Sequence, residues 1–452
     1  MHPDSRGARP DAPDNRAVVL GAGVSGLAAG MVSGAQVFEA ESIPGGLCAS
    51  YYMRPGSAER HFGGAPRAGD YYRFEPGGGH WIFGGEPSTL EMIQDYAHCN
   101  RISRRSSVFL HGSNRYIPYP IQENLRYLGA EQATRALAEI RAGNASGRTM
   151  QEWLAARFGS SLGDLFFAPF HEAYTAGLYR AIAPQDGFKS PIDLLKIEQG
   201  AREGAEPTGY NISFLYPEAG LHALVSELAR RATVHYGKRA TKIDPEKREI
   251  SFADGSAVDY RAVVSTLPLH QICALAGIEI DEPTDPYTSV LVLNIGARRG
   301  ARCPDEHWVY TCGTDAGFHR VGFYSNVDSR FAPEIPGEPR VSIYVEKAYA
   351  GGTRLSPQDI AAYASSVIRE LRSWEFIGEV DVVDPTWVEV GYTWSWPDSN
   401  WRSKAIDALE SQGIFPTGRY GRWVFQGIAE SIQAGLVAGE NLRREVDPSA
   451  QS

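Results

Sequence analysis

The segment Arg16-Ala-Val-Val-Leu-Gly21-Ala-Gly23-Val-Ser-Gly26-Leu-Ala-Ala decides the fold. A short β-branched run stops at Gly21, and a stretch of helical composition follows it. In a dinucleotide-binding fingerprint of this spacing, the first glycine makes the turn, the second admits a pyrophosphate, and the third lets the helix pack closely on the strand. Residues 36–40 (QVFEA) then return to strand composition. We therefore expect a βαβ unit whose helix directs free N–H groups at phosphates.

An acidic residue and a second pair of glycines follow this unit. Glu39 ends the second strand 18 residues after Gly21, where a carboxylate can accept both ribose hydroxyls; the slightly short spacing predicts a short helix. Gly45 and Gly46 come directly behind it in the run EAESIPGG. This arrangement resembles the signature of the FAD superfamily that includes amine oxidases, protoporphyrinogen oxidase and UDP-galactopyranose mutase. The resemblance implies FAD as the cofactor.

Composition limits the classes of protein to consider. A chain of 452 residues is long enough for two or three packed units that share a site. A formal net charge of −10 argues against nucleic acid or anionic lipid as a partner. The sequence has no run of about 18 apolar residues, and its start lacks the pattern of a signal peptide, so we expect a cytoplasmic protein with no membrane partner. The five cysteines contain no CxxC pair, which argues against a disulfide framework or a metal site.

The remaining patterns predict loops, helices and strands in successive segments of the chain. Residues 42–85 read as irregular, glycine-rich loops against a ligand, residues 90–199 as mostly helical, and residues 218–231 as a helix. Strands and hairpins follow, with several antiparallel strands between residues 289 and 392, a helix near 358–373, and a last helix from about Ala429 to Arg444. The expected fold class is α/β: a Rossmann-like FAD-binding domain with a helical insertion and an antiparallel-sheet substrate domain. The expected boundaries are a disordered leader (1–15), the FAD-binding domain (16–100, 211–285 and 405–445), the helical insertion (101–210), the sheet domain (286–404) and a tail (446–452).

The run Phe74-Glu-Pro-Gly-Gly-Gly-His80-Trp-Ile-Phe83 marks the expected flavin end of the site. Three consecutive glycines permit the backbone to approach a flat ring closely. The imidazole of His80 can then hydrogen-bond near the flavin pyrimidine or N5.

Six segments resemble the UDP-galactopyranose mutases, particularly their eukaryotic form. They are GGHWIF (78–83), NRYIPYPIQEN (114–124), GYNISFLYP (209–217), HWVY (307–310), FHRVGFYSN (318–326) and GRYGRW (418–423). The resemblance implies an intramolecular transferase, or isomerase, that interconverts the pyranose and furanose forms of an NDP-hexose without net redox change. In that family the N5 atom of the reduced flavin attacks the anomeric carbon, so no side chain has to act as the nucleophile.

The same resemblance implies roles for individual residues. His80, Arg320 and Lys189 would take part in catalysis, with Arg320 and Lys189 steadying the leaving diphosphate. Cofactor contacts are expected at Gly21, Gly23, Val24, Ser25, Gly26, Glu39, Ala40, Gly45, Gly46, Leu47, Gly78, Gly79, His80, Trp81, Arg419, Gly427 and Ser431. Substrate contacts are expected at Tyr119, Gln122, Asn124, Lys189, Asn211, Phe214, Trp308, Tyr310, Arg320, Tyr392 and Trp396. The helix from about Ala429 would aim its N-terminus at the N1/C2 edge of the flavin.

Departures from the family pattern leave alternatives open. Lys189 stands where the family has a second diphosphate arginine, and Val327 and Trp396 stand where it has tyrosines. The family's N-Q-D-H motif is replaced by GIAES at residues 427–431. A substrate that is a different nucleotide sugar fits these changes. NAD(P)H or another reductant would reduce the flavin. The oligomeric state stays open, and a homo-oligomer is one possibility. The alternatives are an FAD-dependent oxidase or dehydrogenase of the amine oxidase or protoporphyrinogen oxidase type, and a non-catalytic flavin-binding scaffold.

Overall fold

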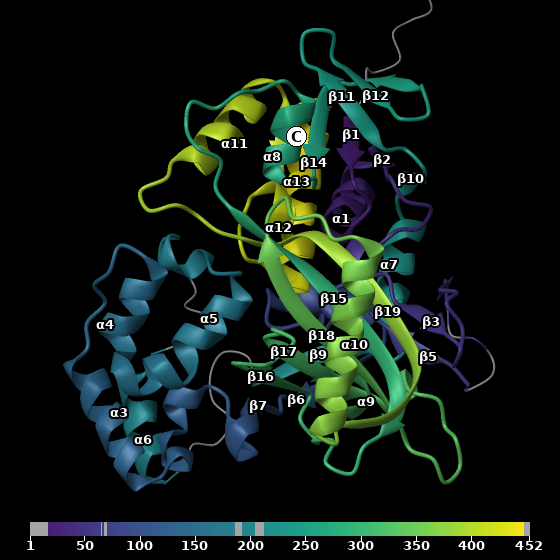
Figure 1. The fold of residues 1–452 in the computed structure, drawn as a ribbon. Coiled ribbons are helices and arrows are strands. Elements are labelled where there is room, and N and C mark those ends of the chain that lie inside the picture. Colours follow the sequence, from purple (N-terminus) through teal and green to yellow (C-terminus); the bar gives the residue numbers. More distant parts are fainter. Residues whose placement is uncertain (1–16, 65, 67–69, 186–191, 204–211, 447–452) are drawn as a thin grey trace, which may run out of the picture.

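The computed structural model describes residues 17–64, 66, 70–185, 192–203 and 212–446. The leader expected at residues 1–15 lies outside this part of the chain, as does the expected tail beyond Val446. Three units are visible in Figure 1: a unit that contains the N-terminal strand, a large sheet backed by a long helix, and a separate group of helices.

The first unit is built on the predicted βαβ segment. Its five-stranded sheet has the order β10-β2-β1-β14-β20, and every neighbouring pair is parallel. The strands are β1 (Ala17–Leu20), β2 (Gln36–Phe38), β10 (Thr233–His235), β14 (Ala262–Ser265) and β20 (Ile414–Pro416). The predicted short helix is α1 (Val24–Ser33), and α7 (Leu221–Arg230) is the helix predicted before β10. The sequence therefore predicts the Rossmann-like core correctly.

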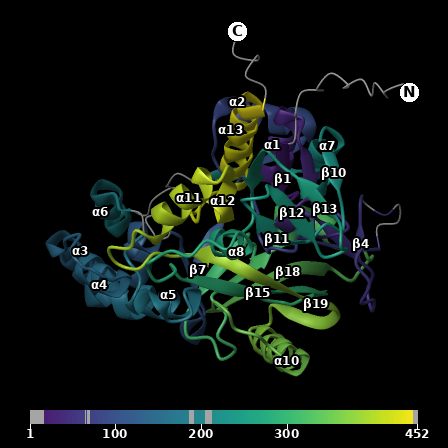
Figure 2. The same ribbon diagram turned by 90° about the horizontal axis from the view of Figure 1, so that it is seen from above.

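The last helix of the chain completes this unit. Helix α13 (Ile428–Val446) packs against α1, and two glycines permit the contact. A Cβ atom at Gly435 would lie 2.1 Å from the carbonyl oxygen of Ser25, and one at Gly439 would lie 2.6 Å from that of Ala29. The two ends of the described chain are thus side by side (Figure 2).

Two expectations about the first half of the chain are wrong. Residues 42–85 are not wholly irregular, because β3 (Tyr51–Met53), β4 (His61–Phe62) and β5 (Tyr72–Phe74) form a small antiparallel sheet around the buried rings of Tyr51 and Phe74. Residues 90–199 are not helical throughout. After α2 (Pro87–Tyr96) come β6 (Cys99–Ser103), β7 (Ser106–Leu110) and β8 (Arg115–Pro118), whose Val108, Phe109 and Ile117 are buried. The predicted helical group begins at α3 (Ala130–Ala142) and continues through α4 (Met150–Leu162), α5 (Ala168–Tyr174) and α6 (Leu194–Arg202) (Figure 1).

The large sheet has seven strands in the order β19-β15-β18-β17-β16-β7-β8. It contains β15 (Tyr287–Arg299), β16 (Trp308–Thr311), β17 (Arg320–Phe323), β18 (Arg340–Ala350) and β19 (Ile377–Thr393), and every pair is antiparallel except β16 with β7. Helix α10 (Pro357–Ser373) covers one face, where Leu291, Ile343 and Val367 are buried together. The other face turns toward the FAD-binding unit (Figure 2).

Shorter elements complete the described chain. They are the sheet β11 (Ala240–Asp244), β12 (Glu249–Phe252) and β13 (Ala257–Asp259), the strand β9 (Ser213–Pro217) that pairs with β6, and the helices α8 (Leu269–Leu275), α9 (Tyr324–Val327), α11 (Trp401–Ser411) and α12 (Gly418–Gly421).

Candidate functional site

The glycine fingerprint has the geometry of a phosphate cradle. A Cβ atom at Gly21 would lie 2.3 Å from Thr266 Oγ1 and one at Gly26 would lie 1.9 Å from the carbonyl oxygen of Gly21, so both glycines are required by packing. At Gly23, by contrast, a Cβ atom would meet nothing within 4 Å. Helix α1 starts there without a side-chain cap or an acidic residue in its first turn. Its first N–H groups, around Val24 and Ser25, therefore suit the phosphates of a dinucleotide.

Glu39 and the second pair of glycines adjoin this cradle. The Glu39 carboxylate accepts the backbone N–H of Ala22 at 2.6 Å and that of Glu41 at 2.9 Å, so it is fixed beside the fingerprint. Ala40 is the residue between Glu39 and Glu41. Gly45 donates its N–H to the carbonyl of Ala22 at 2.8 Å, and the Cβ position of Gly46, which precedes Leu47, lies 3.9 Å from the Cα of Gly23. The predicted adenosine-diphosphate contacts are thus contiguous, and these residues fit FAD.

The three glycines before His80 are required by side chains of the protein itself. A Cβ atom at Gly77 would lie 2.4 Å from the His80 ring, one at Gly78 would lie 2.7 Å from a carboxylate oxygen of Glu346, and one at Gly79 would lie 2.0 Å from the Tyr344 hydroxyl. The protein's own side chains therefore require these glycines, and the close approach to a flat ring stays a prediction. Burial lowers the pKa of His80 to about 4, with a further contribution from Arg419, so the imidazole is neutral at pH 7.

Arg320 lies at the centre of the site, in an ion pair that the sequence did not predict. Its Nε and Nη2 donate to the Glu346 carboxylate, with Nε 2.9 Å from Oε2. The Arg320 side chain is 14% exposed and that of Glu346 is 2% exposed. Burial alone would raise the pKa of Glu346, but the guanidinium holds that pKa below its usual range. Any anion bound by Arg320 therefore meets a guanidinium that is already neutralised on one edge.

Tyrosines from three strands surround this ion pair. Tyr310 on β16, Tyr344 on β18 and Tyr392 on β19 are close enough to Arg320 to influence its ionisation. Burial raises the pKa of Tyr344, and its hydroxyl is buried without a hydrogen-bond partner in the described residues. Such a phenol stays protonated and can donate to a ligand.

Helix α5 contributes aromatic rings on the other side of the site. Its Phe170 ring is 5.3 Å from that of Tyr310, and its Tyr174 ring is 4.7 Å from that of Tyr392. Tyr119, which follows β8, lies against the same group, with its ring 4.6 Å from Tyr310. The helical unit thus closes over the tyrosines of the sheet.

Arg419 lies near His80, and Gly427, the residue before α13, lies near Phe83 of the same segment as His80. Arg419 donates to the carbonyls of Gln426 and Gly391, both at 3.0 Å, and lies over the ring of Phe425. The N–H of Gly427 is already capped by Glu430 at 2.7 Å, while the carbonyl of Ser431 accepts the Ser25 hydroxyl of α1 at 2.8 Å. This arrangement connects the start of α13 to the fingerprint.

Two further groups of predicted site residues are buried: one around Trp81 and one that follows Tyr119. Trp81 stacks on Phe214 at 5.3 Å, Trp308 lies 6.3 Å from Phe214, and both indole N–H groups are buried without a partner in the described residues. Gln122 and Asn124 are buried after the cis Tyr119–Pro120 bond, and Asn124 Nδ2 donates to the carbonyl of Pro120 at 2.9 Å.

The site roles expected for three other residues stay predictions. The indole of Trp396 donates to the carbonyl of Thr284 at 3.0 Å, and its backbone N–H donates to Asp285, so it anchors a loop. Lys189 and Asn211 lie outside the described residues. Conversely, sequence reasoning missed Glu346 and Tyr344. Their signal was the alternation in β18, where Val341, Ile343 and Val345 face α10 and Tyr344 and Glu346 alternate with them on the opposite face.

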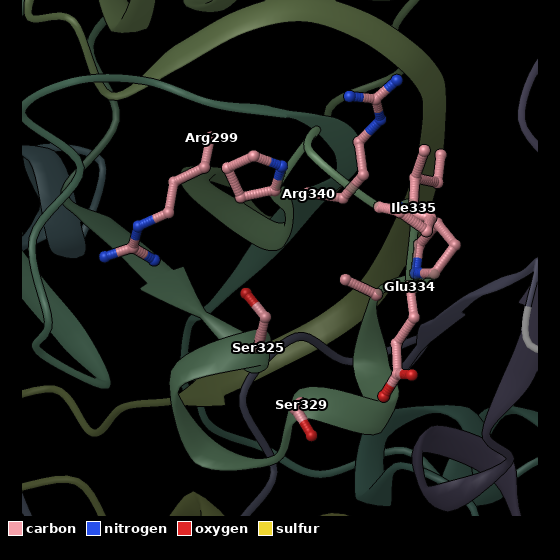
Figure 3. A pocket seen from close by; sticks show the side chains of 10 residues that line it. Arg299, Ser325, Ser329, Glu334, Ile335 and Arg340 are labelled. Atoms are coloured by element: carbon pink, nitrogen blue, oxygen red, sulfur yellow. The ribbon is translucent and has the colours of Figure 1, made fainter.

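A pocket of about 490 Å³ lies elsewhere, past the far end of β17 (Figure 3). Its lining includes Arg299, Ser325, Ser329, Glu334, Ile335 and Arg340. Arg299 is paired with Asp305 and Arg340 with Asp381, both at 2.8 Å. Because these charges are neutralised, and because His80 and Arg320 do not line it, we do not assign the substrate to this pocket.

The family comparison decides how the chain is classified. Residues 27–446 match the family described as flavin-containing amine oxidoreductase. The chain belongs to this family. It is therefore an FAD enzyme of the amine oxidase superfamily, and the predicted cofactor is confirmed.

Three solved structures share the fold of this family member over nearly its whole length. A reduced UDP-galactopyranose mutase is 21% identical, with 96% of this chain and 98% of that one covered and a TM-score of 0.79. A Pyrococcus furiosus protein is 18% identical, with coverage of 94% and 97% and a TM-score of 0.58. An oxidoreductase from Methanosarcina mazei is 17% identical, with coverage of 92% and 98% and a TM-score of 0.57.

Two kinds of feature are absent from the described residues. These residues contain no helix long and apolar enough to cross a bilayer. They also contain no group of three or more His, Cys, Asp or Glu side chains placed to hold a metal ion.

Proposed function

We propose that this FAD enzyme is a nucleotide-sugar mutase, which interconverts the pyranose and furanose forms of an NDP-hexose. One observation carries the proposal: His80, Tyr310, Tyr392 and Arg419, which come from four separate segments of the chain, lie around the largely buried Arg320. The likeness to a UDP-galactopyranose mutase over 96% of the chain supports it. Reduced FAD, when bound, would supply the nucleophilic nitrogen for the anomeric carbon.

The residues of the site can bind and orient such a substrate. Glu346 engages the Nε and Nη2 atoms of Arg320, which leaves Nη1 for a phosphate oxygen. The protonated Tyr344 hydroxyl can donate to a sugar or phosphate oxygen, and neutral His80 can exchange a hydrogen bond without adding charge. Phe170 and Tyr174 would exclude water from the tyrosine side of the site.

The test is anaerobic incubation of the dithionite-reduced protein with a panel of NDP-hexopyranoses, followed by chromatography and mass spectrometry. We expect an isomer of equal mass and no stoichiometric consumption of reductant. Absence of any isomer from every NDP-hexose that protects the reduced protein against thermal unfolding would refute the proposal.

One observation favours a second function, that of an oxidase or dehydrogenase. Because Glu346 neutralises Arg320, the centre of the site suits an uncharged substrate as well as a diphosphate. An enzyme of that kind would start from oxidised flavin and release hydrogen peroxide or reduce another acceptor in every turnover. Oxygen-dependent loss of two hydrogens from a substrate would identify it.

A further inference from the structure

Glu75 is a fully buried carboxylate that meets hydrogen-bond donors from three parts of the FAD-binding unit. The Ser50 hydroxyl lies 2.8 and 2.9 Å from its two oxygens, and the Tyr216 hydroxyl lies 2.5 Å from Oε1. The backbone N–H of Leu221, at the start of α7, donates to it as well. The carboxyl group is therefore held from three sides.

The backbone carbonyl of Glu75 is held just as firmly, from the substrate sheet. It accepts Asn294 Nδ2 of β15 at 3.0 Å and the Tyr324 hydroxyl of α9 at 3.2 Å. It also accepts the N–H of Gly78 at 3.2 Å, which closes the turn that leads to His80. Glu75 thus joins the FAD-binding unit and the sheet at the first residue of this turn.

The turn between Glu75 and His80 consists of glycines, so only its close packing and its two ends hold its backbone in place. Gly77, Gly78 and Gly79 have no side chains to interlock with their surroundings, and a glycine run has many alternative backbone conformations. On one side the turn accommodates the His80 ring, and on the other it lies against Glu346 and Tyr344. Beyond this packing, its position depends on its two ends: Glu75 on one side, and on the other Ile82, whose N–H and carbonyl pair with Leu215 at 3.1 and 2.9 Å.

We infer that Glu75 is a positioning residue: it fixes the Gly77–Gly79 turn and so holds His80 in its partly buried place opposite Arg419, Glu346 and Arg320. This inference does not depend on which reaction the enzyme performs. It predicts that changes at Glu75 alter the environment of an imidazole five residues away, beyond any loss of stability.

The chain offers graded variants and a matched control. In Glu75→Gln one of the two acceptor oxygens is replaced by an NH₂ group that cannot accept, so Ser50, Tyr216 and the N–H of Leu221 are left with one acceptor oxygen in place of two. Glu75→Asp keeps the acceptor character and should disturb the turn less. The control is Glu370→Gln in α10, on the opposite face of the sheet, because Glu370 is also buried and accepts the backbone N–H groups of Asp315 and Ala316, both at 2.9 Å.

The test is a proton NMR titration of the His80 imidazole in the full-length, FAD-loaded protein, with its signal assigned by comparison with His80→Gln. Around this imidazole the charged groups are Arg419, Glu346 and Arg320, and none of them is changed. We expect the wild-type pKa to lie far below 6.5, and the pKa in Glu75→Gln to rise toward 6.5 by about one unit or more as water reaches the ring. Glu75→Asp should show a smaller rise, and Glu370→Gln none.

An unchanged titration of His80 in a folded Glu75→Gln protein would overturn the inference, as would an equal shift in Glu370→Gln. If Glu75→Gln does not fold, Ser50→Ala and Tyr216→Phe, which each remove a single donor, decide in its place. A rise in the pKa of His80 in either supports the inference, and no change in both refutes it.

Discussion

Replacing Arg320 by methionine is the most informative single change in the site, because it leaves the Glu346 carboxylate buried without its cation. Loss of one partner of a buried ion pair costs about 3–5 kcal/mol. For a chain of 452 residues that unfolds as one unit, an unfolding entropy of about 2.1 cal/mol/K per residue converts this to a fall in Tm of about 3–5 °C. Urea denaturation and thermal unfolding, each followed by circular dichroism, would measure the change.

The same variant should change how stability depends on pH. In the wild type Arg320 lowers the pKa of Glu346 to about 2, so the pair stabilises the fold above about pH 4.5 and loses this contribution as the pH falls toward 2. Without the guanidinium, burial raises the pKa of Glu346 instead, and the destabilisation should be larger at pH 8 than at pH 5. Arg320→Met combined with Glu346→Leu should recover most of the loss. An equal loss at both pH values, or a double variant less stable than the single one, would show that the ion pair does not have the role described.

Three further predictions concern other parts of the molecule. Gly23→Ala should leave the stability of the cofactor-free protein within about 0.5 kcal/mol of the wild type yet abolish the yellow FAD absorbance, because its Cβ enters the open space beside α1. Gly26→Ala should destabilise both the free and the FAD-bound protein, because its Cβ clashes with Gly21. A yellow Gly23→Ala protein would contradict this assignment. Burial raises the pKa of Glu75 to about 7, so wild-type stability should decline as the pH rises from about 4.5 to 7, and Glu75→Gln should remove that decline; an identical pH profile in the two proteins speaks against it. Trp396→Phe should cost about 1 kcal/mol of stability, because it removes the hydrogen bond to Thr284, and should leave the affinity for the substrate unchanged. A large fall in that affinity would show that Trp396 contacts the substrate.

The cofactor-binding half of the site was predictable because its chemistry is local in sequence. Gly21 and Gly26 have a steric reason within the fold, Gly23 leaves open space at the start of α1, and Glu39 lies where a strand of that length ends. The short helix and the return to a strand also follow from composition. These elements depend on neighbours in the chain and not on distant partners.

The substrate half was less predictable because its groups meet across long distances in the sequence. Arg320 could be placed by resemblance, but its partner Glu346 is 26 residues away on the next strand, and nothing in either segment encodes the pairing. The strands at residues 99–118 were missed for a similar reason: β7 is stabilised by β16, some 200 residues later. The substrate contact expected at Trp396 stays a prediction, since the structure shows only its hydrogen bonds to Thr284 and Asp285.

The strand order β10-β2-β1-β14-β20 has a consequence for how the enzyme is made. At about 5–20 residues per second on the ribosome, β20 is synthesised roughly 20–80 s after β1, and α13 comes later still. Until then the edge of β14 is unpaired, and the face of α1 that α13 will cover is exposed. Tight cofactor capture should therefore be among the last events of biogenesis. A nascent chain stalled before residue 414 would be a client for chaperones rather than a partly working flavoprotein.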